Sequence, residues 1–168
     1  MKIMNKLQNR KEELKKNNKG FSLVELIIVI AIMAILVGIV GTQVIPYIDK
    51  SRNAKDIQKL SGLCTDAMTA YSSNASNLDP AVEYTITIGG TGATDISVSG
   101  GTATEQAKLK EAFQELNNIK TMSDLKLESK SGKATTQVDI TCKNGDPMIK
   151  VDTTVTSPEK DFADITSK

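Results

Sequence analysis

The feature that does most to limit the possible folds is an apolar run near the N-terminus, FSLVELIIVIAIMAILVGIV, residues 21–40. A helix of these 20 residues is about 30 Å long, which is the thickness of the hydrocarbon core of a bilayer. A buried core helix of a soluble protein is the alternative for so Ile/Val-rich a run. We expect a membrane-spanning helix, and its one formal charge, the carboxylate of Glu25, needs a physical account.

The segment before the apolar run is basic. Residues 1–20 contain seven Lys or Arg and two Glu, and seven minus two gives +5. By the positive-inside rule this segment stays in the cytoplasm and the C-terminal remainder is sent outward. Cleavage behind the apolar run is not expected, because no A-x-A-like site follows it. The small residue at a polar-to-apolar junction is Gly20, which precedes the run.

The composition of the remainder excludes several classes of function. Residues 21–168 hold 14 basic and 18 acidic side chains, which gives no basic footprint for nucleic acid. His is absent and Cys occurs only at positions 64 and 142, so His-based catalysis and His/Cys metal sites lack their groups. The acids of the C-terminal tail do not fit the spacing of an EF-hand. We expect no cofactor, no metal and no enzymatic activity, and a membrane-tethered enzyme or receptor domain is the alternative from another class.

The residues around Gly20 carry a resemblance to a known family. Lys19-Gly20 is followed by Phe21-Ser22-Leu23-Val24-Glu25-Leu26 and then by the apolar run. This order closely resembles the class III signal of type IV prepilins and pseudopilins, over residues 19 to about 45. The resemblance implies that a membrane-embedded prepilin peptidase cuts between Gly20 and Phe21 and methylates the new amino terminus of Phe21.

The resemblance also gives Glu25 a role. A carboxylate in a membrane span costs about 2.5 to 3.5 kcal/mol on insertion scales, so it needs a partner. Cleavage frees an α-amino group on Phe21, four residues earlier, on the same side of the helix. In the pilin family the glutamate is thought to meet the amino terminus of a neighbouring subunit. The alternative is a carboxylate that only snorkels to the headgroups.

The helical pattern continues beyond the apolar run. Some relatives place a proline directly after the run, whereas here Thr42 follows Gly41 and the first proline is Pro46. Gly38, Gly41 and Pro46 can each soften or kink a helix. An apolar stripe with helical spacing then predicts a single helix of about fifty residues that ends at the NASNLDP loop. The stripe consists of Ile48, Ile57, Leu60, Cys64, Met68 and Tyr71, with Lys50, Arg52, Lys55, Asp56 and Lys59 mostly elsewhere.

The sequence of the C-terminal part predicts several strands. The expected strands are 83–88, 95–98, 125–130, 134–142 and 148–155, with a second helix over 105–118 that begins at Thr102 or Thr104 and buries Leu109, Ala112, Phe113 and Leu116. The expected turns are Gly89–Gly92, Ser131-Gly132-Lys133 and Asn144-Gly145. Together with the resemblance, the expected class is α+β, the type IV pilin fold: a long N-terminal helix packed on an antiparallel sheet.

The two cysteines are both expected in the core. Cys64 lies on the apolar stripe of the first helix, and Cys142 alternates with Val138 and Ile140. A disulfide between helix and sheet and a pair of buried thiols are both compatible with this pattern.

The expected organisation is a leader at 1–20, a membrane and filament-core segment at 21–44, and a globular head at 45–168. The resemblance implies a type IV pilus subunit that starts in the cytoplasmic membrane and then forms a surface homopolymer for adhesion, aggregation or twitching motility. Its implied partners are other copies, prepilin peptidase, an assembly platform and minor pilins. A pseudopilin of a type II secretion or DNA-uptake system is the closest alternative.

Overall fold

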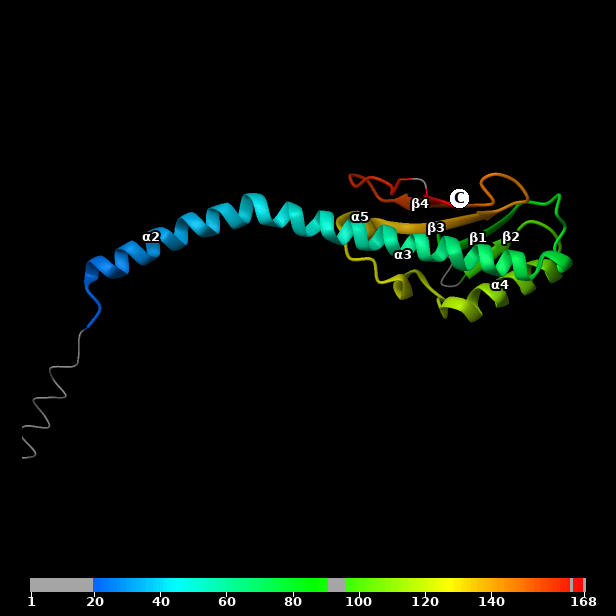
Figure 1. The fold of residues 1–168 in the computed structure, drawn as a ribbon, viewed down its shortest axis with the longest axis horizontal. Helices are drawn as coiled ribbons and strands as arrows, with labels where there is room; N and C mark the ends of the chain where they lie inside the picture. The colour runs from blue at the N-terminus through cyan, green and yellow to red at the C-terminus, as the bar shows by residue number, and fades with distance from the viewer. Residues whose placement is uncertain (1–19, 91–95, 164, 168) are drawn as a thin grey trace, which may run out of the picture. The chain divides into compact units, whose positions relative to one another are not determined.

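The computed structural model describes residues 20–90, 96–163 and 165–167. The expected leader therefore lies outside the described residues except for Gly20, which is exposed and irregular. Contacts divide the chain into two units, Met1–Ile45 and Pro46–Lys168. Figure 1 shows the helices and strands of both units.

The first unit is helical from Leu23 onward. Helix α2, Leu23–Ile39, begins after its N-cap residue Ser22 and contains no buried residue. The π-helix η1, Val40–Val44, follows it, and α3, Ile45–Ser73, continues the helix into the second unit. Within the described ranges, Leu23–Ser73 is the one helix long and apolar enough to cross a membrane, and it comprises 51 residues. The expectation of one helix of about fifty residues is confirmed.

The π-helical segment lies where the sequence predicts a soft point. Pro46 has no backbone N–H, and its ring competes for space with the carbonyl group four residues earlier, at Thr42. The Thr42 hydroxyl donates to the carbonyl oxygens of Gly38 at 3.1 Å and Ile39 at 3.4 Å. The helix widens by one π-turn before the proline and continues as α3; π-helix is rare in proteins and occurs mostly as such single turns inside α-helices.

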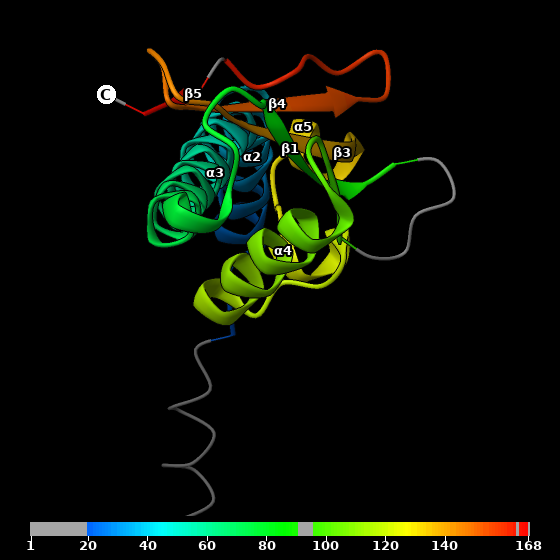
Figure 2. The ribbon, with the colours of Figure 1, turned by 90° about the vertical axis from the view of Figure 1, so that its right-hand side faces the viewer.

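The second unit contains one antiparallel sheet. Its strands are β1 (Tyr84–Gly89), β2 (Ile96–Ser99), β3 (Thr135–Cys142), β4 (Ile149–Val155) and β5 (Ile165–Thr166), in the order β2-β1-β3-β4-β5. Helix α4, Ala103–Asn117, joins β2 to the later strands, and α3 and α4 lie on the same face of the sheet (Figure 2). The α+β class and the pilin-like arrangement of helix on sheet are confirmed.

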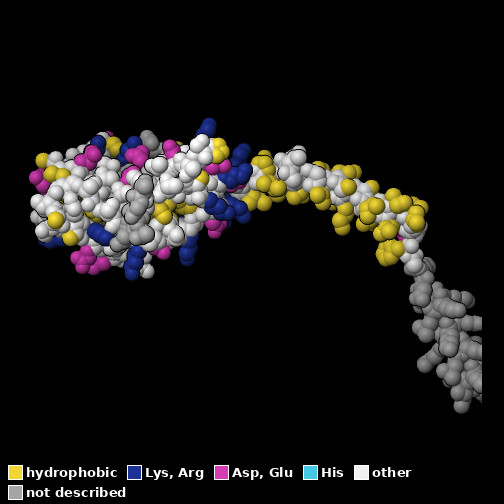
Figure 3. All heavy atoms as spheres, turned by 180° about the vertical axis from the view of Figure 1, so that it is seen from behind, with side chains coloured by type: hydrophobic (Ala, Val, Ile, Leu, Met, Phe, Trp, Pro, Cys, Tyr) yellow, Lys and Arg dark blue, Asp and Glu magenta, His cyan; other side chains and the backbone are white. Residues whose placement is uncertain are grey.

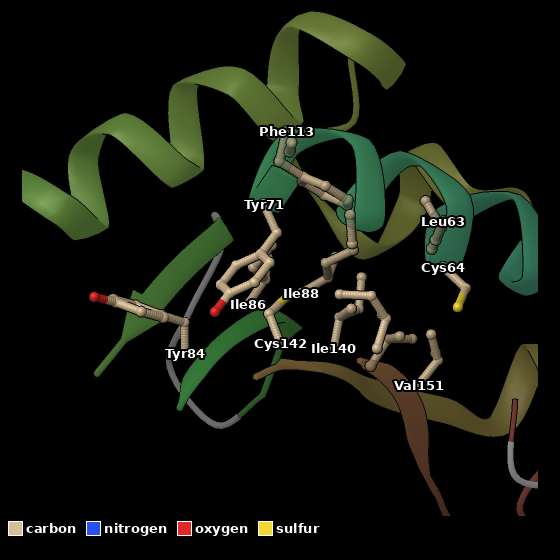
Figure 4. Close-up of a cluster of buried hydrophobic side chains, with 14 of the residues drawn as sticks. Leu63, Cys64, Tyr71, Tyr84, Ile86, Ile88, Phe113, Ile140, Cys142 and Val151 are labelled. Atoms are coloured by element: carbon tan, nitrogen blue, oxygen red, sulfur yellow. The ribbon is translucent and has the colours of Figure 1, made fainter. Parts of the chain in front are cut away.

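The core lies between this sheet face and the two helices (Figure 4). From the strands it takes alternate residues of β1, β3 and β4, as a half-buried strand requires. Helix α4 contributes Leu109 and Phe113, both fully buried. The buried apolar stripe of α3 comprises Leu60, Leu63, Cys64, Ala67, Ala70 and Tyr71.

Part of the expected core is wrong. Ile48 and Ile57 are exposed on α3, and Leu116 is exposed on α4. The buried apolar stripe of α3 begins only at Leu60. It includes the small residues Ala67 and Ala70, which the sequence pattern of larger apolar residues does not indicate. Before Leu60, α3 is held to the rest of the unit by polar contacts instead.

The expected strand at 125–130 and the turn at Ser131-Gly132-Lys133 are also wrong. This region forms the 3₁₀ helix η3, Met122–Leu125, and the short helix α5, Lys130–Ala134. The hydroxyl of Ser129 accepts a hydrogen bond from the Gly132 N–H at 2.9 Å, so a capped helical turn replaces the hairpin. The strand expected at 134–142 is nevertheless confirmed by β3, Thr135–Cys142.

The other boundaries follow the local signals. Thr102 is the N-cap of α4 and forms a capping box with Glu105. Gly89 and Gly90 have φ values of +87° and +93°, as expected where β1 ends, while residues 91–95 of the predicted turn and strand lie outside the described residues. The Asn144-Gly145 segment does connect β3 to β4, closed by a 2.9 Å bond from the Lys143 N–H to the Met148 carbonyl.

Candidate functional site

The candidate site is the start of α2. Phe21 is 88% exposed, and Ser22, with φ −68° and ψ 141°, is the N-cap of the helix. The Glu25 Oε2 atom accepts a hydrogen bond from the Ser22 N–H at 2.8 Å, and the Ser22 hydroxyl oxygen accepts from the Val24 N–H at 3.4 Å. Ser22 and Glu25 together form a capping box. The carboxylate is thus held at the helix N-terminus, where the helix dipole favours negative charge.

The capping box is a partner for Glu25 that the sequence analysis missed. Its signal, Ser-x-x-Glu before an apolar run, is visible in the sequence and is a known mark of a helix start. A backbone N–H satisfies one carboxylate oxygen but does not cancel the charge. A full positive charge at Phe21 would arise only after cleavage, one residue before the same N-cap.

Gly20 is open to approach. It is exposed, it precedes the first helical residue, and a Cβ atom added to it would meet no heavy atom within 4 Å. The peptide bond between Gly20 and Phe21 is therefore outside the helix and unshielded by the described residues, as a protease substrate must be.

A second polar centre lies on α3. Asp56 is fully buried, although the sequence pattern placed it on the polar side of the helix. Its carboxylate accepts hydrogen bonds from the Glu128 N–H, 3.0 Å from both oxygens, and from the Ser129 N–H at 2.8 Å. Lys59 Nζ lies 3.9 Å from Oδ1. About two turns earlier, Asp49 Oδ1 accepts from the Lys130 N–H at 3.1 Å.

These contacts make Asp56 a structural acceptor and not a catalytic base. Both of its oxygens are taken by backbone donors that would otherwise be buried without partners. A Cβ atom at Gly132 would contact Oδ2, so glycine is what allows α5 to approach so closely. Asp49 and Asp56 therefore join the first turns of α3 to the segment 128–130.

The two cysteines are buried and free in this structure (Figure 4). Burial raises the pKa of the Cys142 thiol to about 12, with a smaller contribution from the charge of Cys64. Burial also raises the pKa of Cys64. Both thiols are therefore protonated near neutral pH and are poor nucleophiles and metal ligands. A disulfide between them stays a prediction.

No other group in the described parts of the chain assembles a metal site, since no three acidic or Cys side chains come together there. Two acids of the C-terminal tail have internal partners. Asp152 lies 2.9 Å from Lys150 Nζ, and Asp161 accepts from the Val155 N–H at 2.9 Å.

Comparison with known families bears on the first site. A family model described as the prokaryotic N-terminal methylation motif matches residues 15–41. That range contains Gly20, Phe21, Ser22 and Glu25 and the whole of α2. Comparison with curated proteins and with solved structures found no match. The chain thus carries the methylation motif of type IV pilin signal peptides on a long apolar helix that is followed by an α+β unit, and this combination supports a precursor similar to type IV pilins or pseudopilins.

Proposed function

We propose that the mature chain, Phe21 onward, is a structural subunit of a type IV pilus. The observation that carries the proposal is the joint placement of Gly20, Phe21 and Glu25. An exposed glycine bond, the methylation motif and a carboxylate at the first turn of an apolar helix occur together. A plain membrane anchor needs none of these three features in this order.

The exposed helix explains why the subunit would polymerise. Helix α2 has 17 residues, and all of them except Glu25 and Gly38 present apolar side chains; none is buried within the chain. Lipid covers such a helix in the precursor. Outside the membrane only other copies of the same helix, packed side by side, can keep it from water.

Glu25 would set the register of that packing. Prepilin peptidase would cut after Gly20, and the methylated amine of Phe21 would then meet the Glu25 carboxylate of a neighbouring copy. The capping box holds this carboxylate at the start of the helix in advance. Assembly would thus depend on cleavage, because the uncut chain has no charge at Phe21.

The surface fibre would serve adhesion, aggregation or twitching motility, with an assembly platform and minor pilins as partners. A pseudopilin of a type II secretion or DNA-uptake system is the second candidate, because the same motif and helix serve both kinds of filament. Electron microscopy of the cell surface separates them: long external fibres support the pilus, and their absence from cells that process the chain supports the pseudopilin.

The direct test is mass spectrometry of protein sheared from the cell surface. We expect an N-terminal peptide that begins with N-methylated Phe21. A chain that begins at Met1 and stays in the membrane fraction would overturn the proposal and leave a tethered domain.

Substitution of Gly20 tests the position of the cut. Gly20→Leu should leave the precursor uncut, because the added side chain stands beside the bond that the peptidase must bind. Gly38→Leu is the matched control, since it makes the same change where a Cβ also meets nothing within 4 Å. Intact mass distinguishes the forms by the 20 leader residues. Normal maturation of Gly20→Leu would place the cleavage site elsewhere.

A further inference from the structure

We propose that a collar of basic side chains around the start of α3 binds the phosphate groups of anionic phospholipids while the subunit is held in the membrane. The collar consists of Lys50, Arg52, Lys55, Lys130 and Lys133, all exposed. The inference rests on the proposed function in one respect, namely that the precursor spans the membrane with its second unit outside. The proposed lipid contact belongs to the precursor in the membrane, before the subunit enters a fibre.

The second unit has an uneven distribution of charge. Residues 46–60 and 126–134 together hold seven Lys or Arg and three Asp or Glu, seven minus three or +4. The remaining residues of 46–168 hold seven basic and fourteen acidic side chains, seven minus fourteen or −7. Figure 3 shows Lys and Arg side chains gathered around the start of α3. An anionic surface would therefore attract this end and repel the rest.

Two segments far apart in sequence form the collar because the buried acids join them. Asp56 binds the backbone of Glu128 and Ser129, and Asp49 binds the Lys130 N–H. These bonds bring α5 to the first turns of α3. The carboxylates of Asp49 and Asp56 keep their negative charge, and the net charge of +4 already includes them.

The collar is close enough to a bilayer surface to act there. Lys50 is ten residues beyond Val40 in the sequence, and the headgroup layer is about 6 Å thick. A Lys side chain can reach back along the helix, and the Debye length is about 10 Å at 0.1 M salt. The hydrogen bond from the Lys130 N–H to Asp49 places Lys130 beside the turn of α3 that contains Lys50. Lys55 and Lys133 follow within the next turns.

The arrangement favours a lipid surface over a neighbouring protein. The basic residues of α3 do not form one face, because Lys50, Arg52 and Lys55 are separated by 200° and 300° of helix rotation at about 100° per residue. They lie within about 8 Å of one another along the helix axis instead. A bilayer surface surrounds a helix that crosses it and can therefore contact basic side chains on every side of the helix. A protein partner contacts one face of the helix.

The experiment uses the full precursor in lipid nanodiscs and measures the acetylation rate of each lysine by mass spectrometry. One set of discs contains phosphatidylcholine, and the other also contains phosphatidylglycerol. We expect Lys50, Lys55, Lys130 and Lys133 to react at least about threefold more slowly in the anionic discs, the factor by which a surface potential of about −30 mV concentrates protons. Salt at 500 mM should abolish the difference through screening.

Lys108 and Lys143 serve as internal controls. Lys108 Nζ binds Asn77 at 2.8 Å, beyond the far end of the 29-residue α3, and Lys143 follows β3. Their rates should be the same in both kinds of disc. Equal rates for the collar lysines in both discs would overturn the proposal. So would slowing by added duplex DNA in neutral discs without slowing by phosphatidylglycerol, which would mark a surface for a different polyanion.

A charge-reversal pair tests the contribution of α5. Lys130→Glu with Lys133→Glu should weaken the lipid-dependent slowing at Lys55, whereas Lys108→Glu with Lys143→Glu, the same change in net charge, should leave it intact. Equal effects of the two pairs would overturn the assignment to the collar. Failure of the chain to enter nanodiscs would instead contradict the membrane-held precursor of the proposed function, so the two failures are distinguishable.

Discussion

Replacing Glu25 with alanine should leave the protein in the membrane and cleaved after Gly20 but should reduce polymerised fibre by at least about tenfold. An unpaired amine at Phe21 inside an apolar helix bundle has a cost, because removing one partner of a buried ion pair leaves the other charge uncompensated and costs about 3 to 5 kcal/mol. A loss of only 1.4 kcal/mol per contact already lowers an association constant tenfold. Sheared fibre per cell, measured against processed membrane protein, gives the result.

Two variants separate the charge of Glu25 from its capping role. Glu25→Gln keeps an oxygen that can accept from the Ser22 N–H but has no charge, so we expect it to behave as the alanine variant does. Ser22→Ala removes the hydroxyl oxygen that accepts from the Val24 N–H and keeps the carboxylate, so we expect nearly normal fibre. The opposite pattern, with Gln tolerated and Ser22→Ala defective, would show that helix capping and not charge pairing is what assembly needs.

The elements that sequence predicted well have strong local signals. The apolar run indicates α2 by length and hydropathy, and Thr102 three residues before Glu105 gives the capping box of α4. Alternation of apolar and polar residues places β1, β3 and β4 within a residue or two. In each case the residues that define the element also determine its position, so no distant contact is needed to locate it.

The wrong predictions share a different cause. Whether residues 125–133 form a strand or a capped helical turn depends on Asp56, which is more than seventy positions away. The backbone N–H groups of Glu128 and Ser129 bind its carboxylate and so are not available to a strand ladder. No local pattern in 125–133 records that partner.

The functional residues also divide into those with a local sequence signal and those brought together by distant contacts. Gly20, Phe21 and Glu25 are found from sequence because their order along the chain carries the signal. The basic collar is not found in this way, because its two halves are brought together by Asp49 and Asp56. An aspartate among lysines on a helix is usually exposed, and only the fold reveals that Asp56 is fully buried.

Replacing Asp56 with alanine should lower the free energy of unfolding of the second unit by about 3 kcal/mol, because hydrogen bonds to a charged acceptor contribute about 1.5 to 3 kcal/mol and the two backbone donors would be left buried without partners. Lys59 would also lose its ion-pair partner, but at 40% side-chain exposure that contact contributes little. Urea unfolding of the detergent-solubilised chain, followed by the near-ultraviolet signal of the buried Tyr71 and Tyr84, measures the change.

Controls on α3 distinguish this loss from a general effect on the helix. Gln58→Ala changes an exposed residue of the same turn and should shift stability by less than about 0.5 kcal/mol. Asp56→Asn should fall between the two, since one amide oxygen can still accept but the amide nitrogen cannot. Amide hydrogen exchange gives a second measurement. In the alanine variant the amides of Glu128 and Ser129 should exchange with solvent much faster. The amides of β3 should exchange faster only by the factor that the loss of global stability accounts for. If Asp56→Ala unfolds like Gln58→Ala, the buried carboxylate does not hold α5 to α3, and the joining of the two segments must come from apolar packing alone.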